Sequence, residues 1–470
     1  MTRTFLLFVA LALMAASRVC LMAAEQSGND FEVRPGFKVI NSVAALRAAM
    51  NASNGKIRMK PGEYPVTDAM DDNVNVFLAN GSNNDFDLRG VTLKIDTTVL
   101  ANLRGKAQHL VTFQIKGSGL TFDGATFEDV GENPPYTSTA EFTVSGDNDT
   151  FTSCTFIIRG SAPYGYGLMF GKGRGSNAKD LQKHSAMAVS GNGTRILGCK
   201  FYMYTFGHAI HMHGAQNTLI QDTYIEGKLR SSDEILAEKT GPAAEAGYRD
   251  AFGKPLEKGL MIALPEDGIR AYGPSTEARP RTTGETGVIT AINCTVIRMR
   301  GGINLAEATK PARVENCTVR ESGWPGANYR LPSGSIVRDC KGDAAYAPLL
   351  VLDMNTMKDT SIALEVLDAK AYTRDHFLAV INGSGHKITL TKNDGKALGA
   401  NLPVVCGQGG ARWHDEKVGS GKAPKAQGIT LINNTPQPVI LTKDASGCTV
   451  KSHGSVSDAG AANTVAKTGD

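Results

Sequence analysis

The chain has 470 residues, 41% of them apolar, with 52 glycines and only 2 tryptophans, which is typical of a turn-rich β protein with a continuous core. The formal net charge of +4 excludes a protein that coats a strong polyanion, although it allows a local basic site. We therefore expect no nucleic-acid partner.

Residues 1–24 have the pattern of a signal peptide. Arg3 supplies the positive start, an apolar stretch runs from Phe5 to Ala16, and Ala23 and Ala24 form a cleavage edge. This stretch is too short to span a bilayer, and no later segment is apolar enough to do so. The prediction is a secreted or periplasmic protein without a membrane partner.

Residues 42–51 predict a short amphipathic helix that begins at a capping Ser42. Repeat proteins need such caps, so we expect this helix to close one end of the core. Residues 56–64 (Lys-Ile-Arg-Met-Lys-Pro-Gly-Glu-Tyr) predict the first strand and turn of a domain that covers residues 25–455.

A recurring pattern places a cysteine after a bulky β-former and a polar residue. Three of these cysteines are spaced by 23 residues, and Cys199 and Asp222 have the same spacing. A fixed period in this range, within short β-rich runs, predicts a solenoid with one β-coil per repeat. We interpret the cysteines as a buried structural ladder of free thiols. Its members are Cys154, Cys199, Cys294, Cys317 and Cys340.

A second column of strands alternates apolar and polar positions. Because side chains alternate faces along a strand, the apolar set should face inward. The four strands are 185–191, 208–214, 267–273 and 301–306, and the outward set is Ala188 and Ser190, His211 and His213, Arg270 and Tyr272, and Asn304 and Ala306. Stacked in parallel, they predict His211 beside Arg270 and His213 beside Tyr272, with Asn304 continuing the row.

Two long segments interrupt the repeat, at residues 164–183 and 227–265. Long insertions in compact domains are usually functional or disordered, and these flank the strands with His, Arg and Tyr. The first carries a Gly-Lys-Gly-Arg-Gly-Ser run that lacks the spacing of a phosphate loop. Beyond about residue 353 the period blurs, and residues 456–470 are expected to be a flexible tail.

The helix, the segment 56–64 and the coil repeats, over roughly residues 35–350, resemble the pectate-lyase-like superfamily and, more loosely, the chondroitinase B and alginate lyase family. The resemblance implies an all-β, single-stranded right-handed parallel β-helix with an N-terminal capping helix, and an acidic polysaccharide as partner. Members of that family use a Lys and an Arg near a calcium site. Calcium is therefore a cofactor that the resemblance allows, although this sequence shows no clustered acidic calcium site.

The outward residues suit β-elimination from a uronic acid. Arg270 would neutralise the sugar carboxylate, and His211 or His213 would take the C5 proton. Tyr272 would serve as acid or base. We also expect substrate-binding roles for residues at the starts of these strands, in the same row and in the two insertions. These are His208, Asp267, Asn304, Lys228, Arg230, Lys239 and Arg174.

Other readings remain open at this stage. A zinc site is disfavoured, because His208 has the opposite strand parity from His211 and His213. A glycoside hydrolase on the same fold would need two paired carboxylates, and a uronate C5-epimerase would share the lyase's proton abstraction. A non-catalytic glycan-binding protein is the fourth alternative. We expect a monomer.

Overall fold

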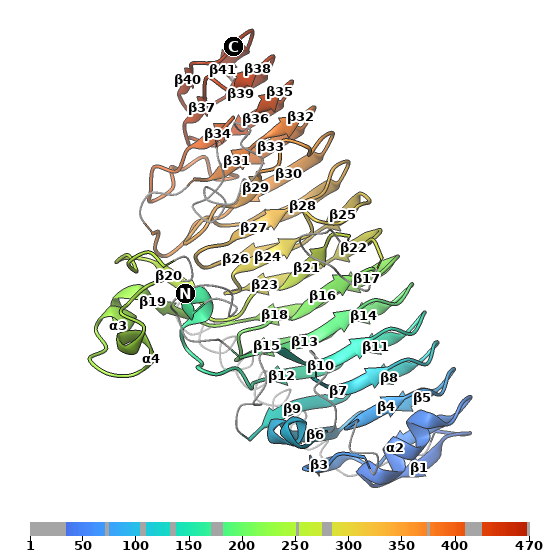
Figure 1. The fold of residues 1–470 in the computed structure, drawn as a ribbon. Coiled ribbons are helices and arrows are strands. Elements are labelled where there is room, and N and C mark those ends of the chain that lie inside the picture. Colours follow the sequence, from blue (N-terminus) through green and yellow to red (C-terminus); the bar gives the residue numbers. More distant parts are fainter. Residues whose placement is uncertain are drawn as a thin grey trace, which may run out of the picture.

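The computed structural model describes residues 34–70, 75–103, 110–131, 138–170, 182–250, 253–274, 284–373, 377–408 and 425–467. Its strands pair in parallel from coil to coil and build one elongated stack (Figure 1). The right-handed parallel β-helix is thereby confirmed. The predicted signal peptide lies outside the described residues.

The first face of the stack is a sheet of thirteen strands among the described residues, and it carries the second column predicted from the sequence. In stacking order these strands are β4 (Phe77–Ala79), β7 (Leu110–Ile115), β10 (Ser138–Val144), β13 (Lys183–Val189), β16 (Ile210–His213), β21 (Ile269–Tyr272), β24 (Gly301–Asn304), β27 (Ala327–Arg330), β29 (Leu350–Leu352), β31 (Ala379–Ile381), β34 (Val404–Cys406), β37 (Val439–Leu441) and β40 (Val456–Asp458).

Two further ladders complete each coil. The second ladder holds β1 (Lys38–Ile40), β2 (Lys56–Met59), β5 (Asp85–Asp87), β8 (Thr121–Asp123), β11 (Thr150–Thr152), β14 (Arg195–Leu197), β17 (Thr218–Gln221), β22 (Ile289–Ile292) and β25 (Ala312–Glu315). The third holds β3 (Gly62–Val66), β6 (Val91–Asp96), β9 (Thr126–Val130), β12 (Thr155–Ile158), β15 (Lys200–Met203), β18 (Tyr224–Glu226), β23 (Thr295–Ile297) and β26 (Thr318–Arg320).

The two ladders merge at β28 (Ile336–Gly342), which pairs with both β25 and β26. Longer single strands follow it, which explains why the sequence period blurs in this part of the chain. They are β30 (Ser361–Val366), β33 (Lys387–Thr391), β36 (Thr430–Asn434), β39 (Thr449–Ser452) and β41 (Thr464–Lys467), beside a small ladder of β32 (Gly383–Ser384), β35 (Ala426–Gln427) and β38 (Ala445–Ser446).

The predicted capping helix is α2 (Val43–Asn51), at the N-terminal end of the stack (Figure 1). The Ser42 hydroxyl accepts from the backbone N–H of Ala45, which satisfies one of the free donors of the first turn. Leu46 and Met50 of this helix are buried in the main core. Above them, rings on successive coils stack at 4.2 Å (Phe77 with Phe113) and 4.4 Å (Phe113 with Phe142), along with other phenylalanines.

The thiol ladder is confirmed, because the cysteines of the repeat are buried and free. Its predicted register is wrong in one coil. Lys200 pairs with Tyr224, so Thr223 rather than Asp222 continues the column above Cys199. That coil has one residue more than the 23-residue spacing assumed.

Asp222 instead occupies the bend between the second and third ladders, where the backbone adopts the left-handed conformation. Its φ is 52°, and the equivalent Asn293 and Asn316 have φ of 55° and 48°. Asn and Asp tolerate this conformation better than most side chains. The side chains of these three residues also form a ladder of hydrogen bonds. The Asn316 amide donates to Asn293 and the Asn293 amide donates to the Asp222 carboxylate, each at 2.8 Å.

The C-terminal prediction of a flexible tail from residue 456 is wrong. β40 pairs with β37 and β41 pairs with β39, so residues 456–467 form the last coil of the stack. The pattern in the sequence is weak here because this coil has few buried apolar side chains: all four residues of β41 are exposed. No helix among the described residues is long and apolar enough to cross a membrane.

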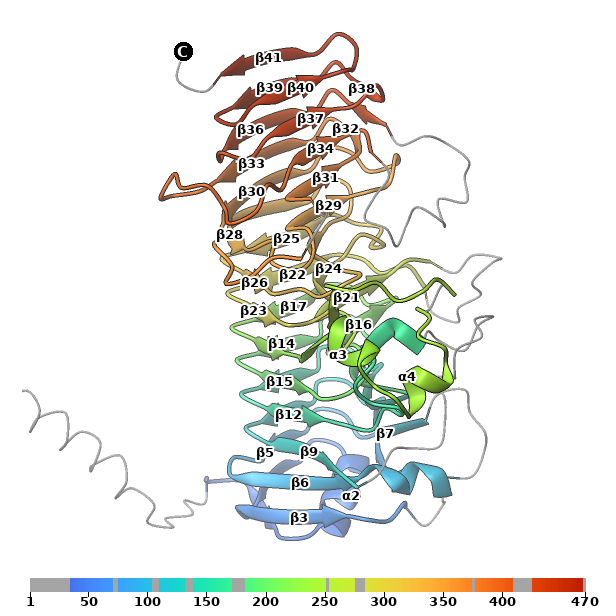
Figure 2. The ribbon, with the colours of Figure 1, turned by 90° about the vertical axis from the view of Figure 1, so that its left-hand side faces the viewer.

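Residues 227–265 leave the coil as a compact projection from the side of the stack (Figure 2). β19 (Leu229–Ser231) and β20 (Met261–Ala263) pair antiparallel at its base, and α3 (Ser232–Leu236) and α4 (Pro242–Glu245) lie between them. Its apolar side chains form a second core with those of the first insertion, which carries η2 (Gly167–Phe170). A further turn, η1 (Thr97–Asn102), lies near the N-terminal end.

Candidate functional site

The predicted register of the polar row is confirmed. On β16 and β21, His211 pairs with Arg270 and His213 pairs with Tyr272, and on β24 Asn304 pairs with Arg270. The apolar residues that alternate with them are buried in the core, so the polar residues lie on the opposite face of the sheet, where the two histidines and Tyr272 are half-buried and Arg270 and Asn304 are buried. This places two imidazoles, a guanidinium and a phenol on one patch of the first sheet, which we call the His–Arg–Tyr row.

Aromatic contacts hold the row together. The His213 ring stacks on Tyr272 with centroids 4.3 Å apart and planes 16° from parallel. The guanidinium carbon of Arg270 lies 4.7 Å from the centre of the same ring. His211 meets His213 edge to face at 5.2 Å. Tyr272 is therefore held by contacts with both His213 and Arg270.

His208 fixes the tyrosine from below. Its Nδ1 accepts a hydrogen bond from the backbone N–H of Asp267 at 3.1 Å, so a neutral ring carries its proton on Nε2. Nε2 lies 2.7 Å from the hydroxyl oxygen of Tyr272 and 3.2 Å from Glu266. We expected His208 and Asp267 to turn outward from the strand starts, but both are only 2% exposed and lie beneath the row.

A buried ion network supports Arg270. Asp267 contacts Arg300 at 3.0 Å and Arg270 at 3.8 Å, and Asn304 donates to it at 3.1 Å. Although burial raises the pKa of Asp267, Arg300 and Arg270 lower it below the ordinary value, so this carboxylate stays ionised. Asn304 is itself buried, so the structure places it as a support for Asp267 rather than on the outer surface.

Arg270 is held ionised by its anionic neighbours. Burial lowers its pKa, but Glu307 and then Asp267 raise it above the usual range. Its guanidinium contacts Glu307, whose side chain is 29% exposed, whereas Asp267 lies deeper. Glu307 is therefore the more exposed of the two carboxylates that contact this buried guanidinium.

The pKa of His211 is lowered well below the ordinary value, first by burial and then by the neighbouring His208 and His213. The ring is therefore neutral at pH 7. A neutral imidazole held beside a permanent cation can accept a proton from a carbon acid whose charge that cation stabilises.

The sequence analysis missed Lys183, at the start of β13. Its ammonium contacts the buried Glu266 and lies 5.5 Å from the centre of the Phe206 ring. The Lys183 side chain is 14% exposed. Glu266 also contacts Arg300 at 3.4 Å. Position was the one available signal, since Lys183 is the first residue of β13, the strand that pairs with β16 of the His–Arg–Tyr row.

The basic residues of the insertions have different environments. Arg230 contacts Glu238 and donates to the carbonyl of Gly165 at 3.2 Å, so it joins the two insertions. Lys228 and Lys239 are exposed, and the ammonium of Lys228 lies 5.6 Å from the ring of Tyr204. Arg174 lies outside the described residues.

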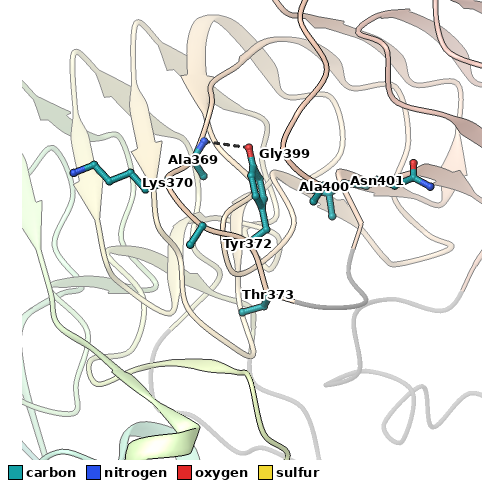
Figure 3. Close-up of a pocket in the computed structure, with 9 residues that line it drawn as sticks. Ala369, Lys370, Tyr372, Thr373, Gly399, Ala400 and Asn401 are labelled. Carbon is teal, nitrogen blue, oxygen red and sulfur yellow. Dashed lines mark hydrogen bonds between the residues drawn. The ribbon is translucent and has the colours of Figure 1, made fainter.

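A surface pocket elsewhere offers less chemistry. It lies among the C-terminal coils and is lined by residues 369–373 and 399–402 (Figure 3). Lys370 is the one charged residue of this lining, and the Tyr372 hydroxyl oxygen accepts from the backbone N–H of Ala369 at 3.1 Å. The pocket has neither a carboxylate nor an imidazole, so we place the candidate site at the His–Arg–Tyr row.

Comparison with solved structures finds the fold of this chain in an alginate lyase. The alginate lyase AlyF-OU02 superposes with a TM-score of 0.55 at 14% identity, covering 92% of this chain and 89% of that chain. A PL6 alginate lyase in complex with a trisaccharide has a TM-score of 0.45 at 11% identity, covering 93% and 86%. The A-module of a mannuronan C-5 epimerase from Azotobacter vinelandii has 0.42 at 7%, covering 90% and 93%.

No family model and no curated protein sequence matches the chain. The likeness to AlyF-OU02 shows a shared fold, the parallel β-helix that the ladders of this chain also form.

Proposed function

We propose that the protein is a secreted polysaccharide lyase that cleaves a uronic-acid-containing polysaccharide by β-elimination at the His–Arg–Tyr row. The observation that carries the proposal is the pairing of a neutral His211 with a permanently charged Arg270 on adjacent strands. The fold shared with an alginate lyase supports it.

In this proposal the sugar carboxylate binds Arg270 and takes the place of Glu307. Pairing with a guanidinium withdraws charge from the carboxylate, so that the C5 proton becomes more acidic. His211 takes this proton, and the electrons of the C5–H bond form the C4–C5 double bond. The bond from C4 to the glycosidic oxygen breaks, and Tyr272, held by His208 and His213, protonates the leaving oxygen.

The buried carboxylates favour elimination over hydrolysis. A hydrolase needs one carboxylic acid and one carboxylate that both reach the glycosidic bond. Glu266 and Asp267 are instead buried and bound to Arg300. Glu307, the more exposed of the local carboxylates, is bound to Arg270. None of the three is placed as an open acid–base pair.

The test is to incubate the protein with a panel of uronate polysaccharides and follow the ultraviolet absorbance of the unsaturated product. We expect this absorbance to rise with at least one member of the panel. New reducing ends without the absorbance would mean hydrolysis, and inversion at C5 without cleavage, seen by proton NMR, would mean epimerisation. Binding without any change in the glycan would leave a non-catalytic role, and each of these three results contradicts the lyase.

A further inference from the structure

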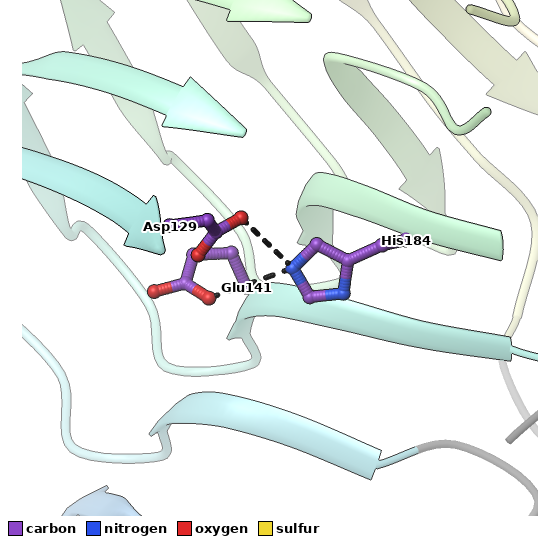
Figure 4. A group of neighbouring side chains, drawn as sticks. All are labelled: Asp129, Glu141 and His184. Atoms are coloured by element: carbon purple, nitrogen blue, oxygen red, sulfur yellow. Dashed lines mark ion pairs between the residues drawn. The ribbon is translucent and has the colours of Figure 1, made fainter. Parts of the chain in front are cut away.

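Three side chains that can bind a metal converge inside the stack, at the start of the strand that carries Lys183 and outside the His–Arg–Tyr row. Asp129 comes from the end of β9, Glu141 from β10 and His184 from β13, and they point toward one another (Figure 4). His184 Nε2 lies 3.3 Å from Asp129 Oδ2 and 3.6 Å from Glu141 Oε2. All three side chains are fully buried.

The hydrogen bonds of Thr139 indicate the tautomer of His184, that is, which of its two ring nitrogens carries the proton. The Thr139 hydroxyl donates its single proton to the carbonyl of Lys183 at 2.9 Å. It therefore accepts from His184 Nδ1, 2.6 Å away, and Nδ1 carries the proton. In a neutral ring the unprotonated Nε2 then points its lone pair at two carboxylate oxygens, a contact that either a proton on Nε2 or a bound cation would relieve.

Within the described residues the two carboxylates have few other polar contacts. Among the ion pairs of the described residues, His184 is the only partner of Asp129 and of Glu141. Both oxygens of Glu141 and Oδ1 of Asp129 are buried without a hydrogen-bond partner. Buried carboxylate oxygens without a hydrogen-bond partner are costly, so these atoms are candidates to bind a cation.

We propose that Asp129, Glu141 and His184 bind a divalent transition-metal ion of the Zn²⁺ class as a structural site. Ligand atoms at about 2.1 Å around a tetrahedral ion lie about 3.4 Å from one another, close to the observed separations from His184 Nε2. The three side chains would supply three of the four positions and a water molecule the fourth. The imidazole nitrogen favours Zn²⁺ over calcium, which takes oxygen ligands.

The surroundings of the three ligands are those of a metal site. Thr139 orients His184 through the ring nitrogen that faces away from the cluster, and the backbone N–H of Arg159 donates to Asp129 Oδ2 at 2.9 Å. Because the three ligands are fully buried, a substrate could not reach the ion, and its role would be structural. The ion would link β9, β10 and β13 through one ligand from each strand. Because His184 follows Lys183 in the chain, it would also fix the start of the strand that carries Lys183.

The first test uses the wild-type full-length chain. After incubation with ZnCl₂ and gel filtration, elemental analysis should find about one zinc per chain. Removing it with a chelator should lower the melting temperature by about 5 °C or more. With Co²⁺ in its place, visible absorption should show a four-coordinate ion with a nitrogen ligand. Absence of bound metal at millimolar ZnCl₂ with an unchanged melting temperature would overturn the proposal and leave a cluster bridged by protons.

The second test places the ion. Glu141→Gln and His184→Gln should lose the zinc, whereas His386→Gln, which alters a buried histidine bound to Thr360 and Asn382, should retain it. Zinc that persists in both cluster variants would contradict the assignment. Should these variants not fold, the Co²⁺ spectrum of the wild-type chain decides. Neither readout depends on lyase activity, so the two proposals fail separately.

Discussion

His211 combines two properties that a proton acceptor needs. Its ring is half-buried beside Arg270, and its pKa is lowered by burial and by His208 and His213. It therefore remains neutral where an exposed histidine would already carry a charge. The same depression affects stability, because below about pH 6.5 the unfolded chain binds a proton that the folded chain does not.

We predict from this that activity on a uronate polysaccharide persists below the range in which an ordinary histidine titrates. The pH at which kcat is lost on the acid side of its profile should lie below about pH 6.5. The free energy of unfolding should decrease as the pH drops through that value, and His211→Gln should remove this part of the decrease. Rate profiles and urea titrations across about pH 5 to 8 would check both. An acid limb centred near 6.5 would contradict the assigned base.

Arg270 and Tyr272 provide the sharpest test at the level of single residues. Arg270→Ala and Tyr272→Phe should each lower kcat/KM by about 100-fold or more, because each removes a charge or proton that acts in the transition state. Steady-state rates on the responsive glycan would measure this, with circular dichroism to confirm the fold.

Matched controls exist on the other faces of the stack. Arg313 pairs with the surface Glu315 on β25, and Tyr202 lies on β15 of the third ladder. Arg313→Ala and Tyr202→Phe should leave the rate within about twofold of the wild type, since exposed pairs contribute little. Near-normal rates in both site variants would remove the His–Arg–Tyr row as the catalytic site.

At the level of elements, each coil bends between the second and third ladders at a residue in the left-handed conformation. Asn293 and Asn316 satisfy this bend and pair their amides along the stack. A non-glycine side chain at positive φ is strained, whereas an asparagine recovers part of that cost through local hydrogen bonds.

We predict that Asn316→Ala destabilises the protein by about 1–2 kcal/mol, because it retains the strain and loses the amide ladder. Asn316→Gly should cost less, since glycine adopts φ of 48° freely. Thermal unfolding of the two variants side by side would show the order. A larger loss for glycine than for alanine would mean that the backbone conformation contributes little here.

On the scale of the whole molecule, the stack must hide its core at both ends. α2 does so at the N-terminus, and the coil of β40 and β41 lies over Val450, Leu441 and Cys448 at the C-terminus. Repeat proteins depend on such terminal units for solubility and stability.

Deletion of residues 456–470 should therefore lower the melting temperature and promote self-association through the exposed strands β37 and β39. Scanning calorimetry and light scattering would detect the two effects. Val465→Ser is the matched control, because it changes an exposed side chain and keeps the backbone pairing of β41. A truncated chain that stays monomeric and equally stable would show that this coil is dispensable.

The strand columns could be predicted from the sequence where its repeat is regular. The alternation in residues 208–214 and 267–273 was sufficient to place His211 beside Arg270 and His213 beside Tyr272. It was not sufficient for Lys183, whose role depends on contact with Glu266 from a coil that lies far along the chain. Spacing alone also misplaced Asp222, because a single added residue shifts a coil without leaving a mark in the local pattern.

The sequence by itself determined the parallel β-helix, the capping helix, the buried thiols and the composition of the outward row, because these follow from local periodicity and from the constraint that strand side chains alternate faces. Only the tertiary structure decided which polar residues lie beneath the row, how the two insertions join, and that Asp129, Glu141 and His184 converge. Those features depend on contacts between residues of different coils. The burial and the charge of such contacts cannot be inferred from the sequence of one repeat.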